Sequence, residues 1–247
     1  MPKQLQDRWP HLLAIMLLLL SLGPTPVPRM VVARYYVAQT ASEHSQYVKA
    51  LTVYEDILLF CPLLTPLHVS AAQNALAAGK PEKALEHLEA ANSHDPADHS
   101  LACLRANTLL AQGNLQGAKQ IWQEVKIECP GALSNLRNFA QDHFQNGQQQ
   151  DAQDAWSTLV DFNPLDPEGQ LRLGMLTATQ SPEQALAHLR LADDLYPEGS
   201  PIARDLIQTI EDSRMTNQPA FTLAQVGQAF TRYEEWQFSK WALQKAL

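Results

Sequence analysis

A 34-residue period runs through this chain and restricts its fold more than any other feature. The prolines that keep this spacing, the last of them one residue early, are Pro62, Pro96, Pro130, Pro164 and Pro197. A first column of small residues consists of Ala38, Ala72, Ala106 and Ala140, with Gly174 and Gly227 in the same position. A second consists of Ala50, Ala84, Ala118 and Ala152, then Ala185 one residue early. Such a period predicts a stack of like structural units.

The columns have the residue types that a pair of antiparallel helices requires. Alanine or glycine lets two helices approach closely where they cross, and a column of large residues fills the volume beside them. That column is Tyr54, Leu88, Trp122, Trp156 and Leu189. Glycines between the small columns, Gly79, Gly113 and Gly147, suit a tight turn, and proline cannot continue a helix. Strong helix formers dominate the composition, so we expect an all-α fold.

This pattern resembles the tetratricopeptide repeat, which has small residues at positions 8, 20 and 27 and proline at position 32. The resemblance implies a right-handed α-solenoid of helix-turn-helix repeats. We expect five repeats, at 31–64, 65–98, 99–132, 133–166 and 167–199, then a degenerate repeat and an incomplete one within 200–247. Because the last unit stops before its terminating proline, either the polypeptide is truncated or its last helix pairs elsewhere.

Residues 1–30 have the pattern of a signal peptide or membrane anchor followed by a proline-rich spacer. An apolar run from Leu12 to Leu22 follows Lys3 and Arg8, and no charged residue occurs before Arg29. We favour an uncleaved single-pass anchor in the cell membrane, with the repeats extracytoplasmic. The alternative is a cleaved signal and a secreted or periplasmic protein. The absence of Asn-x-Ser/Thr sequons favours a bacterial envelope.

The resemblance also implies where a partner would bind. In this family the first helices of the repeats line a concave groove, and positions 2, 5, 9 and 12 face the ligand. Position 9 holds the carboxamides Gln39, Gln73, Asn107 and Gln141, which can both donate and accept hydrogen bonds. The other candidates are Arg137, Phe144, Leu76 and Leu110. We interpret these eight residues as a groove for a partner peptide or helix, while solvent-exposed helix surface is the competing interpretation of the amides.

Charge and motifs argue against other classes of function. The net charge is −8 and no Lys/Arg-rich stretch occurs, so we expect no nucleic-acid partner. No common catalytic or phosphate-binding motif is present, so we expect no enzyme and no cofactor. His94, Asp95, Asp98 and His99 straddle an expected turn, and we predict no metal site there. Cys61, Cys103 and Cys129 show no disulfide-framework or zinc spacing, so we expect buried free thiols, although one pair could form in an oxidising compartment.

The sequence therefore predicts a non-catalytic protein–protein interaction scaffold that is membrane-tethered or exported. Two alternatives remain. The repeats could form a module of a larger envelope enzyme, such as a polysaccharide or glycosyl transferase, or a structural solenoid that self-associates through an uncapped C-terminal end.

Overall fold

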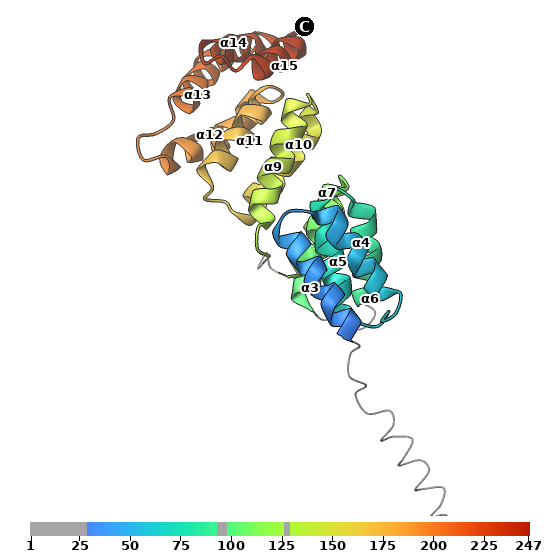
Figure 1. Ribbon diagram of the computed structural model, residues 1–247. Helices are drawn as coiled ribbons and strands as arrows, with labels where there is room; N and C mark the ends of the chain where they lie inside the picture. The colour runs from blue at the N-terminus through green and yellow to red at the C-terminus, as the bar shows by residue number, and fades with distance from the viewer. Residues whose placement is uncertain (1–28, 93–97, 126–128) are drawn as a thin grey trace, which may run out of the picture.

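The computed structural model describes residues 29–92, 98–125 and 129–247, and every regular element in these ranges is an α-helix (Figure 1). The helices are α3 (Arg29–Glu43), α4 (Tyr47–Leu58), α5 (Thr65–Ala77), α6 (Pro81–Asn92), α7 (His99–Ala111), α8 (Leu115–Glu124), α9 (Ala132–Gln145), α10 (Gln149–Phe162), α11 (Pro167–Ala178), α12 (Pro182–Leu195), α13 (Pro201–Arg214), α14 (Pro219–Arg232) and α15 (Trp236–Ala246). The prediction of an all-α helical repeat fold is confirmed.

Tight turns join the two helices of each hairpin from α5 to α10. Gly79, Gly113 and Gly147 have φ angles of +69°, +83° and +74°. In each turn the backbone N–H of the residue after the glycine donates a hydrogen bond to the carbonyl five residues before it. Lys80, for example, donates to the Ala75 carbonyl at 2.9 Å. This bond satisfies a carbonyl that the helix end would leave unpaired. Glycine is used because its lack of a Cβ makes positive φ inexpensive.

The repeating columns form the core. Every alanine of the two small columns is fully buried, and in the large column Trp122 and Trp156 are at most 1% exposed. Gly174 replaces alanine where α11 and α12 approach most closely, because a Cβ there would lie 3.2 Å from the Leu189 backbone nitrogen. The side chains that repeat in the sequence are thus the ones that the fold buries.

The packing is less regular between α8 and α9. Helix α8 makes few contacts with α9, unlike α4 with α5 or α10 with α11. The buried residues form two clusters that divide earlier, within α7, one from Ala38 to Leu101 and one from Cys103 to Ala242. Figure 1 shows α3–α8 gathered at one end of the molecule and α9–α15 at the other. Helix α7 contacts α9 directly, whereas α8 reaches α10 through the rings of Trp122 and Phe162, whose centroids are 6.3 Å apart.

Cys103 and Cys129 form a disulfide, so the expectation of free thiols is wrong for these two residues. They are 26 residues apart in sequence, yet their Cα atoms are only 5.2 Å apart, because the α7–α8 hairpin brings the chain back towards its start. Cys61 is free and partly exposed. It occupies the repeat position of Cys129, but Tyr35 stands where a partner equivalent to Cys103 would be.

The last hairpin turns back onto the middle of the solenoid. The Phe144 ring of α9 lies 4.7 Å from that of Phe238 and 5.5 Å from that of Trp241, both on α15. Arg172 of α11 pairs with Glu235 at 3.4 Å. Helix α15 therefore packs on α9 and α11.

The predicted signal or anchor within residues 1–30 lies almost wholly outside the described part of the chain and stays a prediction. Among the residues that the structure does describe, no helix combines the length and apolar character needed to cross a bilayer.

Candidate functional site

A cleft of about 530 Å³ opens among α5, α7 and α9, the first helices of three successive hairpins. Its lining residues are Leu76, Asn107, Leu110, Ala111, Gln112, Gly113, Asn135, Asn138, Phe139, Asp142 and His143. We call it the α7–α9 cleft. Leucine and phenylalanine side chains supply apolar surface, and four carboxamides supply donors and acceptors. This combination is typical of sites that bind part of another molecule.

A smaller cleft of about 260 Å³ adjoins the first and shares Gly113, Phe139 and His143 with it. It extends towards α10, where Asp151 and Asp154 contribute carboxylates. Neither cleft has a lysine or arginine in its lining. The accessible surface therefore combines apolar groups and amides with a negatively charged edge.

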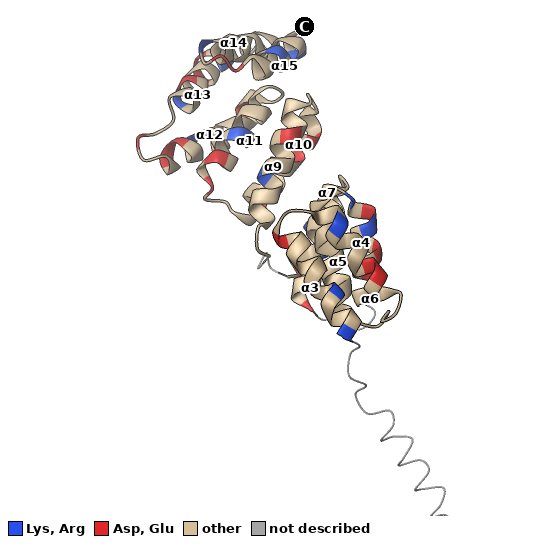
Figure 2. Ribbon diagram, in the orientation of Figure 1, with Lys and Arg blue, Asp and Glu red and all other residues tan. Residues whose placement is uncertain are grey.

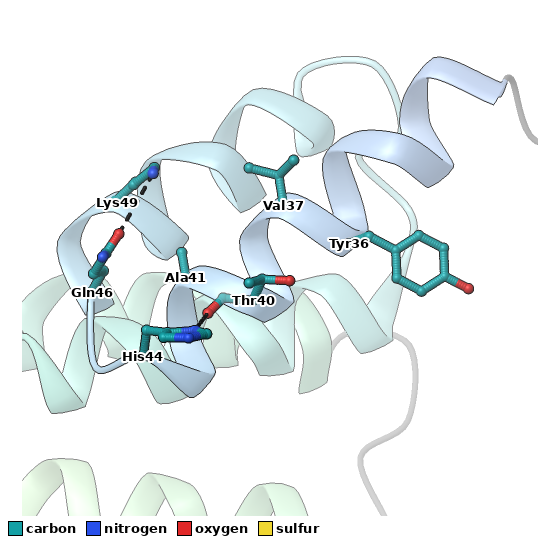
Figure 3. Close-up of a pocket in the computed structure, with 7 residues that line it drawn as sticks. All are labelled: Tyr36, Val37, Thr40, Ala41, His44, Gln46 and Lys49. Carbon is teal, nitrogen blue, oxygen red and sulfur yellow. Dashed lines mark hydrogen bonds between the residues drawn. The ribbon is translucent and has the colours of Figure 1, made fainter.

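The irregular packing between α8 and α9 explains why this surface is open. Phe139, Asp142 and His143 occupy the repeat positions that Val37, Thr40 and Ala41 hold in α3. Figure 3 shows these α3 residues along a cleft of about 450 Å³ on a helix that no described helix precedes. In α9 a complete hairpin, α7–α8, precedes the helix and could cover this face. Phe139, Asp142 and His143 nevertheless line a cleft. The site therefore lies in a gap between neighbouring repeats and is not confined to the concave surface of a single repeat.

Two polar groups at the α7–α9 cleft lack hydrogen-bond partners. Asn107 Oδ1 and His143 Nδ1 are both buried and unpaired. The Phe139 ring lies 4.1 Å from that of His143, and Asp151 Oδ2 is 3.7 Å from His143 Nδ1, too far for a hydrogen bond. A buried polar group without a partner costs about 1–3 kcal/mol. A ligand would complete these two bonds and recover part of that free energy only if the two side chains turned towards the cleft, because both atoms are buried.

Of the eight predicted groove residues, Leu76, Asn107 and Leu110 come together in this cleft. Gln39 and Gln73 are exposed on α3 and α5, and Gln141 is partly exposed on α9. Gln39 donates a hydrogen bond to Glu43 at 3.2 Å. A row of four amides acting on one ligand stays a prediction, and only Asn107 of the four lines the cleft.

Arg137 and Phe144 are engaged inside the chain. The Arg137 guanidinium lies 3.0 Å from carboxylate oxygens of both Asp166 and Glu168. Asp166 also caps α11 by accepting a bond from the Gly169 N–H at 2.9 Å. Phe144 packs on α15, as described above. Neither side chain lines the α7–α9 cleft, and a role in partner binding stays a prediction for both.

The sequence reasoning missed the contribution of α9. Asn135, Asn138, Phe139, Asp142 and His143 line the cleft from positions that do not face the ligand in this family's groove. One signal was available at the position of His143, where the three preceding repeats have Ala41, Ala75 and Leu109. An imidazole that follows three apolar residues at the same repeat position indicates a site where the packing changes.

The cleft residues place hydrogen-bond donors and acceptors beside apolar side chains, an arrangement suited to binding. Within the described ranges, no group of three or more histidine, cysteine or acidic side chains is arranged to hold a metal ion. Asp98 caps α7 by accepting a bond from the Ser100 N–H at 2.7 Å; residues 93–97, with His94 and Asp95, lie outside the described ranges. The pKa of His87 is lowered chiefly by burial and secondly by the neighbouring His68. These two histidines join α5 to α6 and lie away from the cleft.

Two family models, both described as tetratricopeptide repeat, match residues 75–137 and 137–200. Together they span slightly more than half of the chain. This chain belongs to the tetratricopeptide repeat family. Repeats of this kind suggest a protein–protein interaction scaffold.

Solved structures similar to this chain include other helical repeat proteins. A MamA protein is 12% identical, with 67% of this chain and 91% of that chain covered and a TM-score of 0.49. Pseudomonas aeruginosa pilF is 16% identical, with 87% and 97% covered and a TM-score of 0.45. The TPR2AB domain of yeast Sti1, solved in a pHSP90 complex, is 14% identical, with 88% and 98% covered and a TM-score of 0.35. No curated protein matches the chain.

Proposed function

We propose that this tetratricopeptide repeat protein is a non-catalytic scaffold that binds a segment of a partner protein in the α7–α9 cleft. The observation that carries this proposal is the pair of buried, unpaired groups, Asn107 Oδ1 and His143 Nδ1, beside accessible apolar side chains. Unsatisfied groups are uncommon in buried positions, and a peptide backbone offers both N–H donors and C=O acceptors for them.

The lining also restricts the chemistry of the segment. The partly exposed Leu76 and Phe139, beside the buried Leu110, favour an apolar anchor residue. Asp142, Asp151 and Asp154 lie at the edge of the two clefts, whose lining contains no lysine or arginine (Figure 2 shows the acidic and basic residues along the chain). Opposite charges attract, so a lysine or arginine beside the anchor is favoured and an acidic residue is disfavoured. The proposed ligand is an apolar and basic segment.

We further propose that the scaffold works at the outer face of a membrane, held by its N-terminal apolar run. The run from Leu12 to Leu22, which contains no charged residue, supports this placement. The Cys103–Cys129 disulfide supports it independently, because disulfides persist chiefly in oxidising, extracytoplasmic compartments.

Peptide selection tests the binding site and does not require the natural partner. A random peptide library is selected on the purified full-length protein, and enriched peptides are measured by fluorescence anisotropy. We expect enrichment of an apolar residue next to lysine or arginine. Substitution Asn107→Leu should weaken these peptides at least tenfold, about 1.4 kcal/mol. The matched control Gln73→Leu changes an exposed amide at the same repeat position and should leave affinity unchanged.

A photo-crosslinking experiment locates the bound peptide. The crosslinking amino acid replaces Gln112, which lines the cleft, or Gln120, an exposed glutamine on α8. We expect an adduct with the selected peptide from position 112 and none from position 120. Equal adducts at both positions, or equal affinity in the Asn107→Leu and wild-type proteins, would show that the peptide binds elsewhere.

A further inference from the structure

The first two hairpins carry a large exposed apolar surface. Its members, which we call the N-terminal apolar surface, are Val32, Tyr35 and Tyr36 of α3, and Leu59, Phe60, Leu63 and Leu64 of the α4–α5 turn. Leu59, Phe60 and Leu63 are 79%, 73% and 73% exposed. A cleft of about 320 Å³ bordered by Val31, Tyr35 and Leu64 joins α3 to the turn. Exposed apolar surface this concentrated indicates a contact with something outside the described structure.

The charged side chains in the first two turns of α3 are both arginines. Arg29 and Arg34 lie on α3, whose first acidic residue is its last, Glu43. Arg34 meets Asp56 at 3.7 Å, and both side chains remain about half exposed. Figure 3 shows the Tyr36 ring pointing away from α4 into open space. Tyrosines and arginines beside aliphatic side chains are the combination enriched where proteins meet the headgroup region of a bilayer.

The chain itself brings this surface close to an apolar segment. Six residues, 23–28, separate the run Leu12–Leu22 from α3. Fully extended, they reach about 20 Å. If the run enters a bilayer, the start of α3 therefore lies within about 20 Å of the hydrocarbon, a distance of a few headgroup layers at most.

Two other occupants fit less well. The run Leu12–Leu22 is apolar on all sides, so folding it back onto α3 as a helix would expose its outer face to water. A second copy whose α3 ran parallel to this one would bring the arginines of both copies together, which is unfavourable. An antiparallel copy is tested by the sedimentation measurement below. A bilayer covers both the run and the exposed side chains, and its anionic headgroups attract Arg29 and Arg34.

We infer that the N-terminal apolar surface rests in the headgroup region of a lipid bilayer and orients the solenoid there. This inference depends on the membrane attachment proposed above but not on peptide binding. It places the α4–α5 turn at the membrane, with α9–α15 at the far end of the molecule (Figure 1). The scaffold would then have a fixed orientation instead of swinging on a six-residue spacer.

Depth-dependent quenching tests this orientation in the full-length protein. Cys61→Ala removes the free thiol, and a single cysteine is then introduced as Leu63→Cys or Leu165→Cys and labelled with bimane. Leu165 is the matched control because it has the same repeat position three repeats later and is 67% exposed. Vesicles of phosphatidylcholine and phosphatidylglycerol carry a nitroxide-labelled lipid. We expect both proteins to float with the vesicles and position 63 to be quenched several-fold more strongly than position 165.

Each other outcome overturns the inference in a recognisable way. Flotation with equal quenching at the two positions leaves the membrane attachment standing and excludes the orientation. Absence of flotation excludes both the membrane attachment and the orientation. It does not affect the proposal of peptide binding, which is measured in solution. A blue-shifted bimane at position 63 without vesicles shows that the N-terminal run or a second copy covers the surface, and sedimentation distinguishes these two.

Discussion

Replacing Asn107 by leucine should stabilise the protein while it removes the proposed binding contact. In the folded state Asn107 Oδ1 is buried without a partner, which costs about 1–3 kcal/mol relative to a satisfied or apolar group. Leucine also favours the helix over asparagine by about 0.4 kcal/mol. The adjoining cleft of about 530 Å³ leaves room for the branched side chain. We expect the free energy of unfolding to rise by about 1.5–3 kcal/mol.

Thermal unfolding followed by circular dichroism measures this effect. For a chain of this size, at about 2–4 °C per kcal/mol, the gain corresponds to a rise in Tm of about 3–12 °C. Gln73→Leu is the control, because the Gln73 side chain is exposed and a surface change should stay within about 0.5 kcal/mol. A lower Tm for Asn107→Leu, or an equal rise for Gln73→Leu, would refute the premise that Oδ1 is unsatisfied. A stabilised variant that no longer binds the selected peptides cannot have lost binding through unfolding.

Two further predictions concern the rest of the fold. Replacing Cys103 and Cys129 by serine opens a loop closed over 26 residues and should lower the free energy of unfolding by about 3–4 kcal/mol in urea titrations. Cys61→Ser should leave it unchanged; equal effects would contradict the pairing. Burial lowers the pKa of both His87 and His188, so the unfolded state binds more protons and stability should fall as pH drops through about 6.5. Measurements of Tm against pH should show this fall in stability. The double substitution His87→Asn and His188→Asn should make Tm depend less on pH. An unchanged dependence would mean that other titratable groups cause it.

The candidate site was only partly predictable from the repeat pattern. Leu76, Asn107 and Leu110 follow from repeat positions, because one helix face presents the same positions in each unit. The contribution of Asn138, Phe139 and His143 does not, since it arises where α9 packs loosely after α8. How closely one repeat stacks on the next depends on contacts between units, which a position-by-position pattern does not contain.

The sequence by itself determined the helical units, their buried columns and their glycine turns. Helix periodicity and turn chemistry are local, so Ala106, Trp122 and Gly113 have the roles in the structure that their spacing predicts. Tertiary structure alone decided that Cys103 reaches Cys129 and that Phe144 packs on α15. It also decided that Arg137 is paired with Asp166 and Glu168. Each of these contacts joins residues from different helices or repeats, and its geometry is set by packing between units rather than by the residues of either unit.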